Sequence, residues 1–143
     1  MLASWRPPPL GKAVLIVDDN PDLLRFMDRF LKQSGWTIVM AESAQSLDAI
    51  EYERMPNIAA VDYILPDRNG VELAAQLRKH MPTMAIIIMS SAELNERDLI
   101  TCAENDFWVL MKPFLAKEVI KLLDQIRREQ IGRHSGSNAD AIK

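Results

Sequence analysis

The chain has 143 residues, of which 48% are hydrophobic and 26% are charged, and its net charge is −3. This length and composition are typical of one soluble globular domain with a single core. The slight excess of acid gives no electrostatic reason to expect nucleic acid or an anionic membrane as a partner, and no apolar run approaches the roughly 20 residues that span a bilayer. The one cysteine, Cys102, excludes an internal disulfide and favours a cytoplasmic location.

Short apolar runs alternate with amphipathic stretches along the chain. The apolar runs predict strands at 13–17, 36–40, 57–61, 84–89 and 107–111. The amphipathic stretches predict helices at 21–34, from 43 or 46 to before 56, at 69–80, at 94–103 and at 115–130. The proline-rich residues 1–11 and the polar residues 132–143 are expected to be tails, the second one flexible, on either side of a domain that covers 12–131.

The alternation of strands and helices predicts an α/β fold. Short connections favour a five-stranded parallel sheet with right-handed crossovers and five helices on both faces, a flavodoxin-like three-layer sandwich. In the strand order 2-1-3-4-5, ligands bind beyond the carboxyl ends of the strands, where the order reverses between strands one and three. Side chains at those ends are therefore the first candidates for a functional site.

Polar side chains stand at the carboxyl ends of four predicted strands. Asp18 and Asp19 follow the first strand, Asp62 the third, Ser90 the fourth and Lys112 the fifth. Three carboxylates in one crevice repel one another, and a hard divalent cation such as Mg²⁺ relieves this repulsion. With an ammonium group and a hydroxyl group beside it, Asp62 is a candidate nucleophile that takes up a phosphoryl group as an aspartyl phosphate.

Taken one at a time, these residues have other interpretations. A single acid at a strand end commonly caps a helix or lies in a solvated turn, so the five positions carry weight only as a set. A haloacid-dehalogenase-type phosphatase also uses an aspartate nucleophile and Mg²⁺, but it keeps Asp-x-Asp after its first strand, where this chain has Asp18-Asp19-Asn20-Pro21. A flavodoxin-like electron carrier would share the topology, yet an acidic cluster is unsuited to a flavin phosphate.

The ordered motifs resemble the receiver domain of two-component response regulators. The resemblance covers about residues 12–130. The segments that carry it are Val17-Asp18-Asp19-Asn20, Val61-Asp62 with Pro66 and Gly70, Ser90 after an isoleucine-rich strand, and Met111-Lys112-Pro113-Phe114. It implies a module that accepts a phosphoryl group from a histidine kinase or a phosphotransfer protein and switches a surface for a downstream protein, without being a turnover enzyme.

The resemblance also implies a role for each residue of the set. Asp62 would accept the phosphoryl group, Lys112 would bind one of its oxygens, and Ser90 would move towards it. The Lys112-Pro113 peptide bond is expected to be cis. The magnesium ligands would be Asp19, Asp62, the backbone carbonyl of Ile64 and, largely through a water molecule, Asp18.

Several positions depart from the family pattern, among them Ser91, where the family more commonly has Ala after the serine. Three residues before Lys112 the family generally has Tyr or Phe as the partner of the hydroxyl group, whereas this chain has Val109, and strand alternation puts Trp108 on the opposite face. This departure keeps open a second interpretation, a degenerate receiver that acts as a phosphorylation-independent interaction domain. Asn105-Asp106 replaces the usual Gly-Ala before the last strand, and Asn105 is expected to tolerate the left-handed backbone of that turn.

Two further hypotheses concern kinetics and partners. Ile64 cannot orient an attacking water, so slow self-dephosphorylation is expected. Helix 94–103, strand 107–111 and helix 115–130 are expected to form the output face for a downstream protein or a second copy of the chain. Trp108 is either an anchor of that face or part of the core. As given, the chain resembles a stand-alone receiver or one excised from a larger protein.

Overall fold

A computed structural model describes residues 11–142, with the side chains of residues 11–133. The predicted amino-terminal tail therefore lies, apart from Gly11, outside the described residues. No helix in the described part of the chain is both long enough and apolar enough to cross a membrane.

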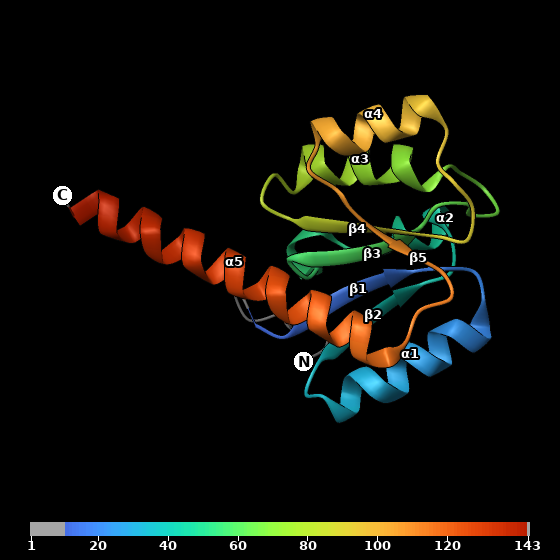
Figure 1. Ribbon diagram of the computed structural model, residues 1–143, viewed down its shortest axis with the longest axis horizontal. Helices are drawn as coiled ribbons and strands as arrows, with labels where there is room; N and C mark the ends of the chain where they lie inside the picture. The colour runs from blue at the N-terminus through green and yellow to red at the C-terminus, as the bar shows by residue number, and fades with distance from the viewer. Residues whose placement is uncertain (1–10, 143) are drawn as a thin grey trace.

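Five parallel strands form one sheet in the described residues (Figure 1). Their bounds are β1 Ala13–Val17, β2 Thr37–Ala41, β3 Ile58–Asp62, β4 Ala85–Ser90 and β5 Trp108–Met111, all within one residue of the prediction. The strands lie in the predicted order, β2-β1-β3-β4-β5. The register pairs Val17 with Val61 and Asp62 with Met89, so the carboxyl ends of β1, β3 and β4 lie level at one edge of the sheet.

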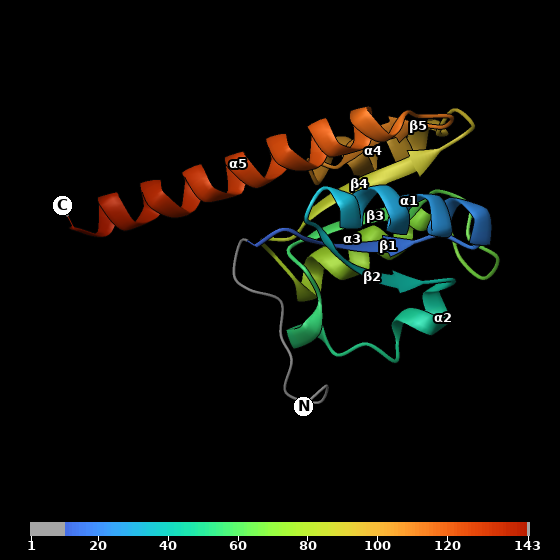
Figure 2. The ribbon, with the colours of Figure 1, turned by 90° about the horizontal axis from the view of Figure 1, so that it is seen from below.

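Helices cover both faces of this sheet (Figures 1 and 2). Helices α1 (Pro21–Gln33) and α5 (Ala116–Ile142) pack on one face, and α2 (Ala44–Leu47), the 3₁₀ helix η2 (Tyr52–Arg54), α3 (Gly70–His80) and α4 (Glu96–Glu104) pack on the other. Successive strand residues alternate between the two cores, since Val14 lies in the α1–α5 core and Leu15 in the α2–α4 core. The central strands β1, β3 and β4 are buried on both faces, which explains why they are nearly continuously apolar.

The helices that leave the carboxyl edge begin at side-chain caps. Asn20 caps α1, because its Oδ1 accepts the N–H groups of Asp22 (3.0 Å) and Leu23 (3.4 Å). Asn69 caps α3 in the same way, through the N–H groups of Val71 (2.7 Å) and Glu72 (3.2 Å). Asn20 directly follows the strand-end acids Asp18 and Asp19, whereas Asn69 ends the loop that follows Asp62, so in both places the local sequence fixes where the helix begins.

The second helix is shorter than predicted. The periodicity suggested a helix that carries both Leu47 and Ile50, but α2 ends at Leu47 and only a 3₁₀ turn follows at Tyr52–Arg54. Ile50, Tyr52 and Met55 still pack against the α2–α4 core from this irregular stretch. Burial of these side chains, and not helical spacing, therefore decides the path of the chain between β2 and β3.

The last helix is longer than predicted. The amphipathic pattern predicted an end near Gln130, whereas α5 continues to Ile142 and extends beyond the sheet (Figures 1 and 2). Residues 116–143 contain no proline, and polar residues alone do not stop a helix. The predicted flexibility of 132–143 stays a prediction.

The turn into β5 uses a different residue from the one predicted. Asn105 has φ −106°, and Asp106 adopts the left-handed conformation with φ 55°. Aspartate tolerates this conformation for the same reason as asparagine, because its short polar side chain bonds locally. The prediction was right about the chemistry of the turn and wrong about the residue.

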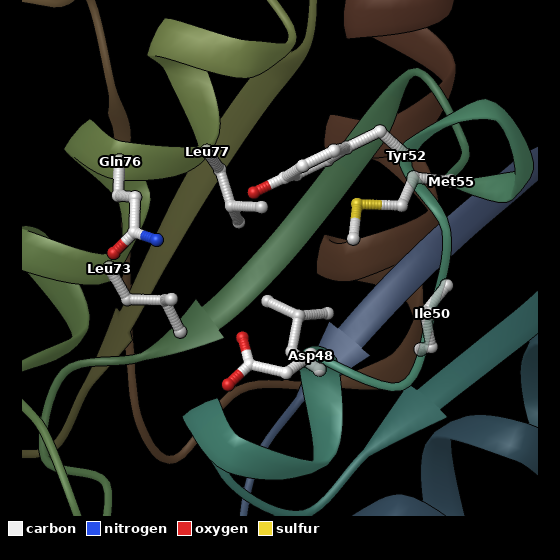
Figure 3. A pocket seen from close by; sticks show the side chains of 8 residues that line it. Asp48, Ile50, Tyr52, Met55, Leu73, Gln76 and Leu77 are labelled. Carbon is white, nitrogen blue, oxygen red and sulfur yellow. The ribbon is translucent and has the colours of Figure 1, made fainter.

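One hollow of about 370 Å³, counted with its open mouth, lies beside η2 and α3 (Figure 3). Apolar side chains of α3, η2 and the end of α2 line most of it, and Asp48 and Gln76 are its polar members. The hollow shares no residue with the acids at the carboxyl edge, so it is no part of the site predicted from the sequence.

Candidate functional site

The three predicted acids meet at the carboxyl edge of the sheet. One carboxylate oxygen of each of Asp18, Asp19 and Asp62 lies within 4.8 Å of the other two. Asp18 and Asp19 follow β1, and Asp62 ends the neighbouring strand β3, so the strand order brings them together. Asp18 is completely buried, Asp62 is 9% exposed, and Asp19 is open to solvent. The acids that were predicted to converge do so.

Lys112 joins this cluster from the far edge strand. Its Nζ donates to Asp18 Oδ2 at 2.7 Å and to Asp62 Oδ1 at 3.3 Å. The Lys112 N–H also bonds the carbonyl of Ser90 at 2.7 Å, which continues the pairing of β4 and β5 beyond the strands. The Lys112-Pro113 peptide bond is cis, as the resemblance implied.

Burial and neighbouring charges shift the acid–base behaviour of the cluster. Desolvation raises the pKa of Asp62, the charge of Asp18 raises it further, and these effects outweigh the opposite influence of Lys112. Burial by itself would lower the pKa of Lys112, but the hydrogen bond and charge of Asp18, together with Asp62, raise it above its ordinary value. Lys112 is therefore held as a cation, and the cluster still has more negative groups than positive ones.

The donor set of the cluster fits a hard divalent cation. All of its side-chain ligands are carboxylate oxygens, which Mg²⁺ prefers over nitrogen or sulfur. Both oxygens of Asp18 already have partners, since Oδ1 accepts the Asn20 N–H at 2.9 Å and Oδ2 accepts Lys112. Asp19 is exposed, and among the residues that the structure describes no side chain or backbone group bonds it, which makes Asp19 and Asp62 the better direct ligands.

In the loop after Asp62, no backbone N–H group of the described residues bonds the Ile64 carbonyl. Gly70 N–H bonds the Tyr63 carbonyl at 2.7 Å, and Leu65 N–H bonds the Arg68 carbonyl at 3.2 Å. These two bonds flank the bridge between Ile64 and Asn69 and use neither backbone group of Ile64. The Ile64 side chain is 66% exposed. The loop therefore agrees with the predicted use of the Ile64 carbonyl as a ligand.

Ser90 lies at the predicted strand end, but its hydroxyl group bonds its own loop. Its Oγ donates to the carbonyl of Ala92 at 2.5 Å and accepts the N–H of the same residue at 3.1 Å. The structure thus places Ser90 at the same edge as the acids and gives its side chain partners other than the acids or Lys112.

The residues of β5 separate as strand alternation predicted. Trp108 is half-buried and packs against the α1–α5 core, whereas Val109 on the other face is 42% exposed. The exposed large apolar side chains of α4, of β5 and of the residue just before α5 are Leu99, Ile100, Val109, Met111 and Leu115. Trp108 was predicted as a possible anchor of the output face. The five exposed apolar residues of the same elements were not predicted from the sequence.

A buried network next to the site was not predicted from the sequence. Asp98 of α4 is 4% exposed and accepts hydrogen bonds from Tyr63 and Asn69, the residues at the two ends of the loop after Asp62. Asp67, in the same loop, accepts the N–H groups of Ala44 (3.1 Å) and Gln45 (2.9 Å) at the start of α2. A tyrosine inside an apolar run was an available signal, because a buried tyrosine hydroxyl usually finds a partner.

Comparison with known proteins gives one family. The family model for the response regulator receiver domain matches residues 14–124. The phosphate regulon transcriptional regulatory protein PhoB of Pseudomonas aeruginosa is 32% identical over 123 residues, which cover 83% of this chain and 53% of that protein. The chain spans about half the length of the curated relatives it matches.

Solved structures agree with this assignment. A CheY-like receiver domain protein from Methanospirillum hungatei superposes with a TM-score of 0.78 at 27% identity, over 85% of this chain and 98% of that one. NtrX from Brucella abortus, with a TM-score of 0.79 at 21% identity, covers 89% of this chain and 29% of its own, and it shows the fold alone. The chain belongs to the response regulator receiver domain family and is a receiver domain of a two-component response regulator.

Proposed function

We propose that this receiver domain accepts a phosphoryl group on Asp62 from a histidine kinase or a phosphotransfer protein, in a reaction that depends on Mg²⁺. The observation that carries the proposal is the meeting of Asp62 with two further acids and Lys112 at one edge of the sheet. Asp18 is fully buried and Asp19 is exposed, whereas Asp62 lies between these extremes. Asp62 is therefore the acid of the cluster that a phosphoryl donor can reach while its environment stays preorganised.

In the proposed reaction an oxygen of Asp62 attacks the phosphorus of a phosphohistidine. A P–O bond forms while the P–N bond breaks, and the leaving imidazole takes the electron pair. Lys112 is already bonded to Asp62 and is available to bind a phosphoryl oxygen, where its positive charge offsets the charge that arrives. A bound Mg²⁺ supplies further charge neutralisation, and Asp19, Asp62 and the Ile64 carbonyl would hold it, with Asp18 acting through a water molecule.

The phosphorylated domain is proposed to act as a switch for another protein and not as a turnover enzyme. The exposed apolar residues of α4, of β5 and of the residue before α5 support this, because exposed apolar side chains are suited to contact with a downstream protein or with a second copy of the chain. A second candidate is a phosphorylation-independent interaction domain. It is favoured by Val109, which leaves Ser90 without an aromatic partner at the family position.

Phosphate analogues separate the two candidates. We would add beryllofluoride with Mg²⁺, or acetyl phosphate with Mg²⁺, to the full chain and measure binding by calorimetry and covalent modification by mass spectrometry. We expect saturable binding of the analogue and one added phosphoryl group on Asp62, both lost in Asp62→Asn. The control Asp48→Asn removes an exposed carboxylate outside the cluster and should change neither. A wild-type chain that binds no analogue and takes up no phosphoryl group would leave only the second candidate.

A further inference from the structure

A buried carboxylate on α4 holds both ends of the loop that follows Asp62. Asp98 Oδ2 accepts the hydroxyl group of Tyr63 at 2.5 Å and the Nδ2 of Asn69 at 3.0 Å. Tyr63 is the first residue after β3, and Asn69 is the last before α3. The segment between them contains the Ile64 carbonyl that is proposed to bind Mg²⁺. One oxygen atom of another helix therefore fixes the entry and the exit of this segment.

The Tyr63 hydroxyl group is also part of the amino-terminal cap of α4. Asn95, the N-cap residue, accepts the Asp98 N–H on its Oδ1 at 2.8 Å, and its own N–H donates to the Tyr63 oxygen at 3.4 Å. In an ordinary capping box the third helical residue would accept the N-cap N–H directly. Here the third helical residue is Asp98, and the tyrosine hydroxyl is inserted between it and the N-cap N–H. The first turn of α4 is thus completed by a residue of the loop.

The backbone links this cap directly to the acid cluster. Asp62 and Tyr63 are consecutive, and their side chains separate, with Asp62 in the acid cluster and Tyr63 in the core beneath α3 and α4. The Tyr63 N–H bonds the Met89 carbonyl at 2.8 Å, which keeps this residue in register with β4. A change in the position of α4 that moves Asp98 must therefore strain or break a bond made by the residue next to Asp62.

The charge of Asp98 makes these bonds stronger than neutral ones. No salt bridge to Asp98 is present among the described side chains, so the loop's hydroxyl and amide groups are the partners that stabilise its buried charge. A buried carboxylate that loses a donor is left with the cost of its own desolvation. The loop and the first turn of α4 are accordingly expected to be ordered together or not at all.

We propose that Tyr63 and Asp98 are positioning residues for Mg²⁺ binding at Asp62, and that occupancy of this site is coupled to the docking of the first turn of α4. This inference rests on the proposed function, because it concerns the same metal site. The coupling is reciprocal: if a docked α4 strengthens the binding of Mg²⁺, then Mg²⁺ stabilises the docked α4 by the same factor.

The affinity for Mg²⁺ alone tests the positioning role. Tyr63→Phe removes only the hydroxyl group, and Asp98→Asn replaces the charged acceptor with a group of similar shape. We expect each variant to raise the dissociation constant for Mg²⁺ by about tenfold, as measured by calorimetric titration of the full chain. This is the lower end of the loss in metal affinity that follows mutation of residues that orient metal ligands. Because both variants alter the same bond, their effects should combine to less than the product of the two single effects.

Two matched variants control for the chemistry of the substitutions. Tyr52→Phe removes the hydroxyl group of a half-buried tyrosine in η2, and Glu96→Gln removes an exposed negative charge from the same turn of α4. Neither side chain bonds the loop after Asp62, so neither should change the affinity for Mg²⁺. If Glu96→Gln weakens binding as much as Asp98→Asn does, general electrostatics explains the effect and the positioning role is overturned.

Amide hydrogen exchange tests the coupling without any activity measurement. We expect Mg²⁺ to slow exchange at residues 95–99 in the wild-type chain and to slow it much less in Tyr63→Phe, which is the milder variant and is expected to fold. If both variants bind Mg²⁺ as tightly as the wild-type chain does, this inference is overturned and the proposed function is left intact. A wild-type chain that binds no Mg²⁺ would overturn both.

Discussion

Gly70 approaches the backbone of Asp62 so closely that a β-carbon on Gly70 would stand 1.9 Å from the Asp62 carbonyl oxygen. The same β-carbon would lie 3.0 Å from the α-carbon of Tyr63. These neighbours are backbone atoms and cannot turn aside as a flexible side chain would. The first residue of α3 is therefore fitted against the two residues that connect the acid cluster to Asp98.

We predict that Gly70→Ala destabilises the fold by about 1–3 kcal/mol, the usual cost of forcing an extra carbon into a packed site. Because the displaced atoms belong to Asp62 and Tyr63, the affinity for Mg²⁺ should fall as well. Denaturant unfolding and calorimetric titration measure the two effects. The matched control is Gly132→Ala in α5. The added methyl group would meet no neighbouring atom, so this variant should stabilise the helix by about 0.5–1 kcal/mol. Equal stability of Gly70→Ala and the wild type would contradict the prediction.

We predict that Lys112→Met destabilises the metal-free protein by about 3 kcal/mol, because it leaves the buried Asp18 carboxylate without its cation. Added Mg²⁺ should recover part of this loss, since it supplies positive charge to the same cluster. Chemical denaturation with Mg²⁺ and with a chelator measures both quantities. Lys117→Met, at an exposed position in α5, is the control and should change stability little. An identical loss with and without Mg²⁺ would argue against a shared site.

Magnesium should raise the melting temperature of the wild-type chain. A ligand at one hundred times its dissociation constant stabilises a folded protein by about 2.7 kcal/mol when the unfolded chain does not bind it. Asp19→Asn should reduce this effect, because Asp19 is the exposed acid whose oxygens are open to the ion. Thermal scans in MgCl₂ and in KCl of matched ionic strength separate specific binding from screening. A similar rise in both salts would count against a metal site.

The Asp67 carboxylate gives a prediction about pH. The N–H of Gln45 and, more weakly, that of Ala44 lower the pKa of Asp67 below its ordinary value, although desolvation acts in the opposite direction. A pKa that is lower in the folded state means that the contribution of Asp67 to stability is complete above the ordinary pKa of the unfolded chain and is lost as the pH falls through the lower, folded-state pKa. Carbon-detected NMR titration of the side chain should show this lowered midpoint.

The matching variant is Asp67→Asn, which keeps an acceptor oxygen but cannot titrate. Its stability should depend less steeply on pH in the acid range than that of the wild type. Asp48→Asn, at an exposed acid without such bonds among the described residues, is the control and should keep the steeper dependence. Parallel curves for the wild type and Asp67→Asn would show that α2 does not depend on this carboxylate.

The side chain of Ile64 leads to a prediction about the lifetime of the phosphorylated state. It is largely exposed beside the acceptor and has no group that can orient water. We expect Ile64→Gln to speed loss of the phosphoryl group by about tenfold, the effect of one added hydrogen bond of about 1.4 kcal/mol in the transition state. Ile64→Leu keeps an apolar group and should leave the rate unchanged. Release of inorganic phosphate from the purified phosphoprotein gives the rates.

The sheet and the acid cluster could be predicted because their signals are local. An apolar run that ends in an acid shows both the strand and the place where the strand reaches the edge, and the short connections fix how the strands are ordered. Asp18, Asp62 and Lys112 therefore appeared as a set although 94 residues separate the first from the last.

Local signals could indicate that Tyr63 has a buried partner, but they could not identify Asp98 as that partner. In the sequence Asp98 is an acid in the first turn of a helix, where acids commonly stabilise the helix end. Its actual partners, Tyr63 and Asn69, depend on how closely α4 lies against α3 and the loop, which no spacing rule contains. The prediction that Ile50 lies in the second helix was wrong for a related reason, because tertiary burial and not periodicity fixed the position of this residue.

The pairing of Ser90 with Ala92 has an energetic consequence for switching. The hydroxyl group is satisfied at rest as both donor and acceptor, so reaching an incoming anion requires an exchange of partners and not the filling of a vacant bond. Exchanges between bonds of comparable strength have small net free energies. We therefore expect two such arrangements to coexist in measurable proportions before any stimulus arrives, so that a signal of a few kcal/mol is sufficient to invert the ratio.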